Sequence, residues 1–405
     1  MKFLFCIAVV IMAVCDGRLR ADTVPYGTEL EVRLTSEASS GKPSGTPVSA
    51  VIIAPVFVDG KLVIAAGTTV SGNTADAKAA VPVAANVAEQ PATLRIQFTK
   101  IADRQGHSQA LYSVVNSIDN ARETVDDSGL IVGITQSQTF EARMDQGINK
   151  LANQYQGLSQ ILSSVKKAVV KQVDADIHYK PGVELQLKVT KAFDWSWPAV
   201  SQNIANVTPA SALIKLVDSQ PIRTVAQQPP SPSDLTNLMF LGTAAQLQTA
   251  FQEAGWFASA ERNRASELET ARAMIEDRGY AEAPMSTLFL EGNPPDLTFE
   301  KQNDTFDKRH HIRIWLRPQR FQGQQVWMGA ATHDISITFS RESRSFTHGI
   351  DPQIDRERSK VVNDLLFTGR VRGLALADRS GIPPNPTNAT GDRLITDGKI
   401  AVVQF

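Results

Sequence analysis

Cysteine is almost absent from this sequence. Its 405 residues include only Cys6 and Cys15, both near the N-terminus. If that segment is removed, the mature protein can form neither a disulfide bond nor a thiolate metal site. A strong charge of either sign is also lacking, because the formal net charge is −1. The sequence therefore predicts no nucleic-acid partner.

Long apolar runs are lacking as well. The run from Phe3 to Cys15 follows Lys2 and is shorter than the roughly 20 residues that span a bilayer. A basic residue before a short apolar core is typical of a secretory signal peptide. We therefore expect residues 1–21 to be a signal peptide cleaved near Ala21. The mature chain, without a membrane span, would be periplasmic or peripheral to the outer envelope, and lipidation at Cys15 stays open.

The remaining sequence predicts two domains, because its length exceeds one ordinary core. Residues 22–218 contain short alternating strands and Gly-rich turns, which indicate a barrel-like or sandwich-like β domain. Residues 219–233 are rich in Pro, Gln and Ser and are expected to be a linker. Residues 234–405 alternate strand patterns with helical patterns and are expected to form a mixed α/β domain. The predicted fold class is thus α+β.

Helical periodicity is clearest in the first domain. Apolar residues at 148, 151, 155, 158, 162, 165 and 169 are spaced three and four apart, which predicts a long amphipathic helix over about 145–172. This heptad seam over 148–169 could pack on its own β domain, bind an envelope partner or bind a second copy. In the second domain, helical patterns occur over 244–254, 266–279 and from 352 onward.

Two stretches of the first domain resemble each other. "YGTELEVRLT" at 26–35 and "YKPGVELQLKVT" at 179–190 both place an alternating strand after Tyr and Gly. Two interpretations stay open. They are either edge strands with similar turns, or the first and last strands that close one sheet.

Four of the six histidines fall in one part of the second domain: His310, His311, His333 and His348. Adjacent residues on a strand point to opposite faces, so His310 should share the core face with Ile312, while His311 should face solvent or a cleft. Imidazole and carboxylate ligands suit a divalent metal, with His310, His348 and Asp334 as candidates. The alternative is a hydrogen-bonded structural network. No cofactor is predicted.

A catalytic hypothesis uses the same region. His311 or His348 would act as the acid/base, Arg309 and Arg313 would hold an oxyanion, and Asp351 or Asp355 would orient a histidine. Such a site would suit an envelope hydrolase of the phosphate-ester class. It requires these groups to meet in one concave site after folding.

The pieces "RHHIRIW", "VWMGAATHD" and "HGIDPQIDRER" follow each other in the second half. Together with less specific matches over about 233–405, they resemble the LssY C-terminal-domain family. This family is a bacterial envelope module associated by name with type I secretion. The resemblance implies ligand-binding candidates, which are Arg309, His310, Arg313, Trp315, Trp327, Asp334 and Arg358. His333 and Gly349 depart from the family pattern, which weakens a polyhistidine metal site.

The leading hypothesis is a non-enzymatic envelope protein, a binding or secretion-accessory component with a His/Arg/Asp cleft. The hydrolase is the alternative, and the sequence leaves open whether the protein is an enzyme.

Overall fold

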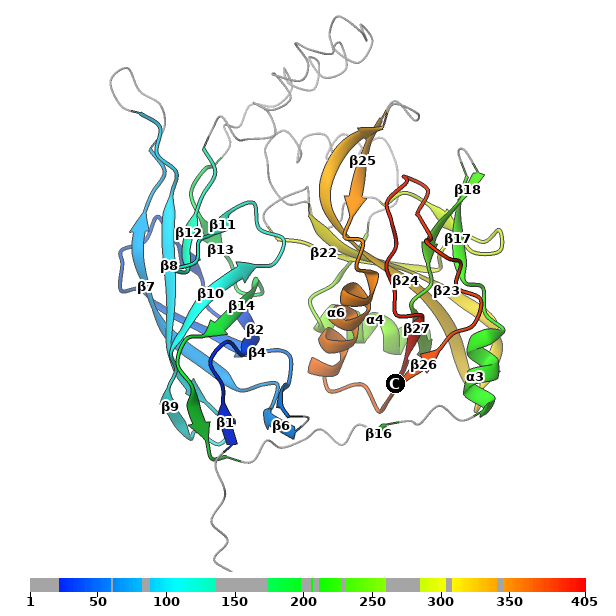
Figure 1. Ribbon diagram of the computed structural model, residues 1–405, viewed down its shortest axis with the longest axis horizontal. Helices are drawn as coiled ribbons and strands as arrows, with labels where there is room; N and C mark the ends of the chain where they lie inside the picture. Colours follow the sequence, from blue (N-terminus) through cyan, green and yellow to red (C-terminus); the bar gives the residue numbers. More distant parts are fainter. Residues whose placement is uncertain are drawn as a thin grey trace, which may run out of the picture.

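The structure is a computed structural model that describes residues 22–59, 61–81, 88–135, 174–197, 205–206, 211–227, 230–259, 285–303, 308–340 and 345–405. The described residues form two β-rich halves that lie side by side (Figure 1). The expected signal peptide, the heptad helix over 145–172 and the helix over 266–279 lie outside the described residues.

The N-terminal half is built on one antiparallel sheet. Its strand order is β10 (Ser113–Ile118), β14 (Glu184–Val189), β2 (Glu29–Leu34), β4 (Pro47–Ile52), β7 (Thr69–Lys78), β8 (Thr93–Ala102), β12 (Leu130–Val132) and β11 (Thr124–Val125), and β9 (Ser108–Ala110) pairs with β8. The end strand β10 also packs against β8 and β11, so the sheet curls.

Three short strand pairs extend this half. They are β1 (Asp22–Val24) with β15 (Phe193–Trp195), β3 (Ala38–Ser39) with β13 (His178–Tyr179), and β5 (Val56–Val58) with β6 (Lys61–Ile64). In the main sheet, β2 and β14 are direct neighbours, with Leu30 opposite Leu187 and Val32 opposite Leu185. The two similar stretches are therefore not edge strands of this sheet but neighbours within it, and β2 and β14 are its first and last strands in chain order.

The C-terminal half holds a second large sheet. Its order is β16 (Ala205–Asn206), β26 (Gly373–Asp378), β27 (Lys399–Gln404), β19 (Leu238–Leu241), β24 (Gln324–Ser340), β23 (Arg309–Phe321), β22 (Leu297–Lys301) and β20 (Phe257–Ala258), and β25 (Ser345–Ile350) pairs with β24. Helices α4 (Ala244–Glu253) and α6 (Ile354–Phe367) pack on one face. Helix α3 (Ser211–Asp218) packs on the other.

The predicted fold class is wrong, because the C-terminal half is β-rich and not a mixed α/β domain. The described residues contain three helices, of 8, 10 and 14 residues, and none of these is a long amphipathic helix. The helical periods near 244 and 354 do form α4 and α6. However, the strand patterns between them merge into β23 and β24, of 13 and 17 residues, which dominate the sheet.

The expected linker over 219–233 is also structured. Strands β17 (Arg223–Gln227) and β18 (Pro230–Leu235) pair with each other, and β21 (Leu288–Phe289) completes a three-stranded sheet. Proline lacks an N–H donor and is tolerated on edge strands. Because β18 is an edge strand, Pro230 and Pro232 are compatible with pairing, and their composition does not mark a linker.

The apolar cores of the two halves are separate. One cluster of buried side chains draws only on residues between Val24 and Trp195. The clusters on the two faces of the second sheet draw only on residues from Leu213 to Phe405. The halves therefore do not share a hydrophobic core among the described residues, and we find that polar groups join them.

Candidate functional site

Strand β23 presents its adjacent histidines on opposite faces of the sheet. His310 lies opposite His333 of β24, whereas His311 lies opposite Thr332. This arrangement was expected, because side chains alternate along a strand. His311 was expected to face solvent or a cleft; it is only 5% exposed, so it does not face open solvent, and Arg313 on the same face is 3% exposed.

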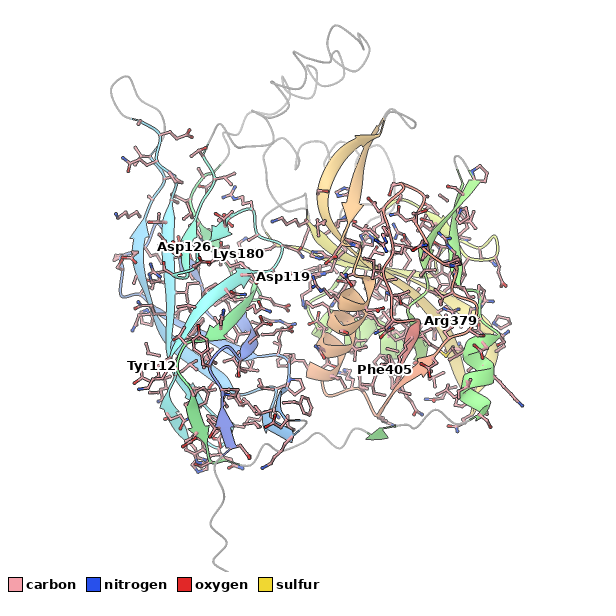
Figure 2. All side chains as sticks on the ribbon, viewed as in Figure 1. Tyr112, Asp119, Asp126, Lys180, Arg379 and Phe405 are labelled. Atoms are coloured by element: carbon pink, nitrogen blue, oxygen red, sulfur yellow. The ribbon has the colours of Figure 1, made fainter. Side chains whose placement is uncertain are left out.

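On the face that carries α6, His310 lies between two carboxylates. Its Nδ1 is 2.6 Å from Oε2 of Glu357 on α6, and its Nε2 is 2.9 Å from Oδ2 of Asp119. The ring of His333 stacks on His310 with a centroid distance of 4.2 Å, and its Nε2 is 2.7 Å from Oδ1 of Asn120. Asp119 and Asn120 follow β10 of the N-terminal half, and Figure 2 shows Asp119 between the halves.

The two stacked histidines differ in charge. Burial lowers the pKa of His310, but Asp119 and Glu357 outweigh burial and raise this pKa to about 10. Burial and the charge of His310 lower the pKa of His333 to about 4. At neutral pH His310 is therefore an imidazolium that donates an N–H to each carboxylate, and His333 is neutral. Neither pKa is tuned for acid/base catalysis near pH 7.

A second group of charges lies beside His310, where β2 and β14 face α6. Glu184 accepts hydrogen bonds from Arg33 at 2.7 Å, from Lys301 at 2.5 Å and from Lys360 at 2.5 Å. Asp364 accepts from both lysines at 2.9 Å. We call Arg33, Glu184, Lys301, Lys360 and Asp364 the interface cluster. Burial raises the pKa of Glu184, but the three cations outweigh burial and hold it well below its usual value.

The opposite face of the sheet has its own polar group, centred on Asp334. Its Oδ2 accepts a hydrogen bond from Arg309 at 3.1 Å and lies 3.4 Å from Nδ1 of His311 and of His348. Burial raises the pKa of Asp334, but the two histidines and Arg309 outweigh burial and lower it. Nε2 of His311 contacts the hydroxyl of Thr332 at 2.5 Å. Asp334 is thus fully committed to structural contacts.

Glu300 of β22 completes this group. Its Oε2 accepts a hydrogen bond from Arg309 at 3.0 Å, and its side chain is fully buried. Burial raises the pKa of Glu300 to about 8, although Arg309 acts in the other direction. Among the described residues, Oε1 of Glu300 has no hydrogen-bond partner.

Three other candidates on this sheet hold backbone or loop groups. Arg313 donates to the Ser286 carbonyl at 3.1 Å. The indole N–H groups of Trp315 and Trp327 donate to backbone carbonyls at 3.1 Å and 2.9 Å. These bonds fix loops around the sheet.

The candidates on and before α6 form a third location. Asp351 accepts a hydrogen bond from the backbone N–H of Gln353 at 2.9 Å. Arg358 pairs with Asp355 at 3.0 Å and with Asp397 at 2.8 Å. This group holds the segment before β27 against the start of α6.

The candidate residues therefore do not meet in one concave site. His310 lies on the opposite face from His348 and Asp334, so the structure does not assemble the metal set predicted from the sequence. His311 and His348 both lie beside Asp334, which the hydrolase hypothesis did not name, and neither is paired with the expected Asp351 or Asp355 in the contacts above. Whether any of these residues binds a ligand stays a prediction.

Sequence reasoning missed the contribution of the N-terminal half. Asp119 is 191 positions from His310, and nothing in the local sequence marks it as a partner. Conversely, His333 was discounted because it departs from the family pattern, yet its ring stacks on His310. In the sequence, the adjacent Asp119 and Asn120 after a strand are typical of an ordinary turn.

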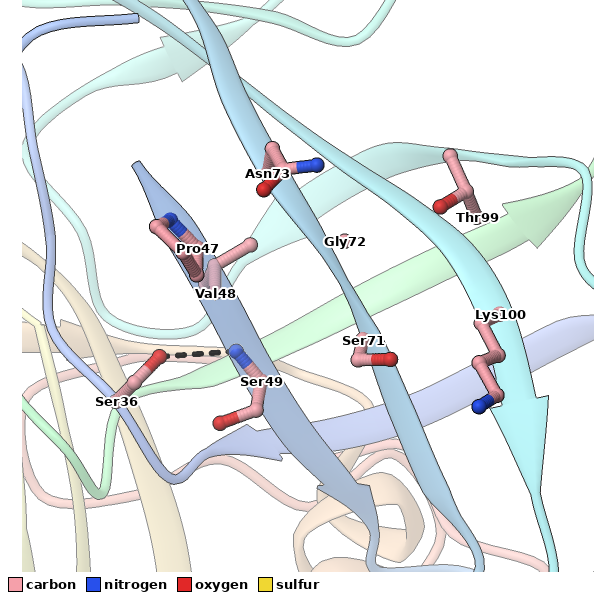
Figure 3. A pocket seen from close by; sticks show the side chains of 9 residues that line it. All are labelled: Ser36, Pro47, Val48, Ser49, Ser71, Gly72, Asn73, Thr99 and Lys100. Atoms are coloured by element: carbon pink, nitrogen blue, oxygen red, sulfur yellow. Dashed lines mark hydrogen bonds between the residues drawn. The ribbon is translucent and has the colours of Figure 1, made fainter. Parts of the chain in front are cut away.

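A hollow of about 430 Å³ lies elsewhere, on strands β4, β7 and β8 of the N-terminal sheet. Figure 3 shows its small polar lining, including Ser49, Ser71 and Lys100, and the hydrogen bond from the Ser49 N–H to the Ser36 hydroxyl. It contains no histidine or carboxylate. The lining offers no acid/base pair, so this hollow does not replace the predicted cleft.

Comparison with known proteins identifies the second half. The family model described as LssY C-terminus matches residues 218–400. These residues are similar to that family, and we refer to them below as the LssY C-terminal domain. No curated protein matches the sequence. A solved structure, ComB10 of the Com type IV secretion system of Helicobacter pylori, is 15% identical, covers 45% of this chain and 94% of its own, and has a TM-score of 0.23. A TM-score this low supports no argument about fold or function.

The matched region begins at the last residue of α3 and includes most strands of the second large sheet. The His310 face of this sheet is covered in part by the N-terminal half. The family match fits an envelope or secretion-related role. No helix among the described residues is both long enough and apolar enough to cross a membrane.

Proposed function

We propose that the protein is an exported, non-enzymatic component of the bacterial cell envelope that acts as a binding or secretion-accessory protein. The observation that supports this most directly is the state of the candidate acid/base groups. His311 is 5% exposed and contacts the Thr332 hydroxyl, and His348, whose side chain is 20% exposed, lies 3.4 Å from the buried Asp334. A group held in this way cannot reach a substrate proton without local opening.

The LssY C-terminal domain is the second support. The second half resembles a family that is associated by name with type I secretion. This association supports an accessory role in export. The N-terminal pattern of Lys2 and the apolar run to Cys15 supports delivery to the periplasm by a cleaved signal peptide.

The test combines location and activity. The full chain should appear in the periplasmic fraction after osmotic shock, with a mature N-terminus near position 22. The purified protein should not hydrolyse p-nitrophenyl phosphate or bis-p-nitrophenyl phosphate with or without divalent metals. Turnover that His348→Ala and His311→Gln abolish, while His107→Gln leaves it intact, would establish the hydrolase instead.

One observation keeps the hydrolase as the second candidate. His311 and His348 both lie 3.4 Å from the same Asp334 oxygen, and Arg309 is beside them. Opening of the Asp334 face would expose two imidazoles and a guanidinium together. The activity assay above distinguishes this case.

The heptad seam over 148–169 stays a candidate contact for a partner or a second copy. Leu158→Asp would place a charge in the seam. We expect this substitution to lower the mass measured by light scattering if the chain self-associates through the seam. An unchanged monomer mass would support packing within the chain.

A further inference from the structure

Three side chains meet where the halves touch. A carboxylate oxygen of Asp119 and one ring nitrogen each of His310 and His333 lie within 4.8 Å of one another. Asp119 comes from the N-terminal half, and the two histidines come from the LssY C-terminal domain. Two imidazoles and a carboxylate form a common donor set for zinc and other first-row divalent metals.

The closest pair is slightly tighter than a zinc site requires. Zinc binds nitrogen and carboxylate oxygen at about 2.0–2.2 Å, so two ligand atoms around a tetrahedral ion lie about 3.3–3.6 Å apart. Nε2 of His310 is 2.9 Å and 3.0 Å from the two oxygens of Asp119. A cation could therefore take a place beside these atoms with small movements. The ligand nitrogen of His333 lies within 4.8 Å of the other two ligand atoms, and to reach the cation its ring would have to leave its stack on His310.

The hydrogen bond on the other side of the His310 ring also favours a metal site. A metal-bound histidine usually donates its other ring N–H to a carboxylate, which fixes the ring and makes it more basic. Nδ1 of His310 lies 2.6 Å from Oε2 of Glu357, so this N–H donates to Glu357 and Nε2 faces Asp119.

The local charge is compatible with a cation here. Asp119 and Glu357 contribute two negative charges against the single positive charge of His310, and Lys360 of the interface cluster also acts on Asp119. When a divalent cation binds, the Nε2 proton leaves to solvent and the metal takes its place. The cation then balances both carboxylates. The side chain of Asp119 is 27% exposed, which leaves a route from solvent.

We propose that Asp119, His310 and His333 together bind one divalent transition-metal cation, with zinc as the expected occupant, across the contact between the two halves. Glu357 positions His310 from behind. This set differs from the one that the sequence suggested, since it excludes His348 and Asp334. The bound metal fastens the N-terminal half to the LssY C-terminal domain, which is a structural role and goes beyond the proposed function.

The test uses the full chain without a histidine tag, stripped with EDTA and titrated with zinc chloride by calorimetry. We expect one zinc per chain, confirmed by elemental analysis, and release of about one proton, measured in buffers of different ionisation enthalpy. Zinc should also raise the melting temperature. Absence of stoichiometric binding would overturn the proposal, as would several weak equivalents without a rise in melting temperature.

Matched variants locate the site. His333→Gln should weaken zinc binding at least 100-fold, and Glu357→Gln about 10–100-fold. His348→Gln, on the other face, and His107→Gln, in the exposed pair with Asp103, should bind as the wild type does. If His348→Gln loses binding and His333→Gln keeps it, the metal binds elsewhere and the proposal fails.

A folding defect can be separated from the loss of a ligand. His333→Gln and Asp119→Asn are compared with the wild type by circular dichroism and by melting in EDTA. Where a variant melts lower in EDTA, Co²⁺ absorption spectra serve as the second readout. The wild type should show ligand-field bands that the folded variant lacks, and identical bands in both would contradict the assignment.

Discussion

Substitution of Glu184 tests most directly how the two halves are held together. Its carboxylate accepts hydrogen bonds from Arg33, Lys301 and Lys360 and is only 6% exposed. Breaking a buried ion pair by removing one partner costs about 3–5 kcal/mol, because a charge is left without its counter-ion. In Glu184→Gln both lysines keep Asp364, so we expect a loss near the lower limit, about 3 kcal/mol.

The measurement is urea unfolding at pH 7, followed by tryptophan fluorescence. Glu253→Gln is the control, because its pair with Arg370 is about half exposed and we expect no measurable change. The pH dependence gives a second readout. Since the pKa of Glu184 is lowered from 4.5, its stabilising contribution is present above pH 4.5 and is lost as the pH falls further.

The difference between the Glu184→Gln variant and the wild type should therefore shrink in acid. A variant within about 0.5 kcal/mol of the wild type at pH 7, which is the range of ordinary surface substitutions, would mean that the interface cluster does not form in solution.

Three further predictions concern individual contacts. The pKa of Glu300 is raised from 4.5 to about 8, so the wild type should lose stability as the pH rises from 4.5 to 8, by at most about 5 kcal/mol. Glu300→Gln should flatten that part of the pH profile in urea unfolding, and an unchanged slope would contradict the assignment. A Cβ on Gly72 would lie 1.7 Å from the Gln97 carbonyl oxygen, so Gly72→Ala should cost about 3 kcal/mol, measured by thermal unfolding. The indole of Trp256 donates to Asp364 at 2.9 Å, so Trp256→Phe should cost about 1.5–3 kcal/mol, and a neutral result would show that the bond contributes nothing net.

Local patterns in the sequence predicted which face each side chain takes. The alternation correctly indicated that the segments of β2 and β14 are strands, while their position in the sheet stayed open. The placement of His310 and His311 on opposite faces also followed from the period of two. These predictions succeeded because the period of a strand is a property of a few consecutive residues.

Contacts between residues that are distant in sequence could not be predicted in the same way. Nothing near His310 indicates that Asp119, 191 positions earlier, supplies its counter-ion. The prediction of a single cleft was wrong because it grouped polar residues by their proximity in sequence. Strand β23 instead places alternate side chains on opposite faces of the sheet. The prolines at 230 and 232 indicated a linker, yet at the edge of a small sheet they lose no ladder hydrogen bond.

The contact between the halves follows from where the apolar residues are. Each half packs its own core, so little apolar surface remains to join them. Charges can take that role only if each is matched, because the cost of desolvating an ion is recovered only with good geometry. The interface cluster holds three cations and two carboxylates, whereas the group around His310 holds one cation and two carboxylates, so the two neighbouring groups together are balanced. A divalent cation at Asp119, His310 and His333 would replace the Nε2 proton of His310, and the expectation that it binds rests on the donor set and on the spacing of these ligands.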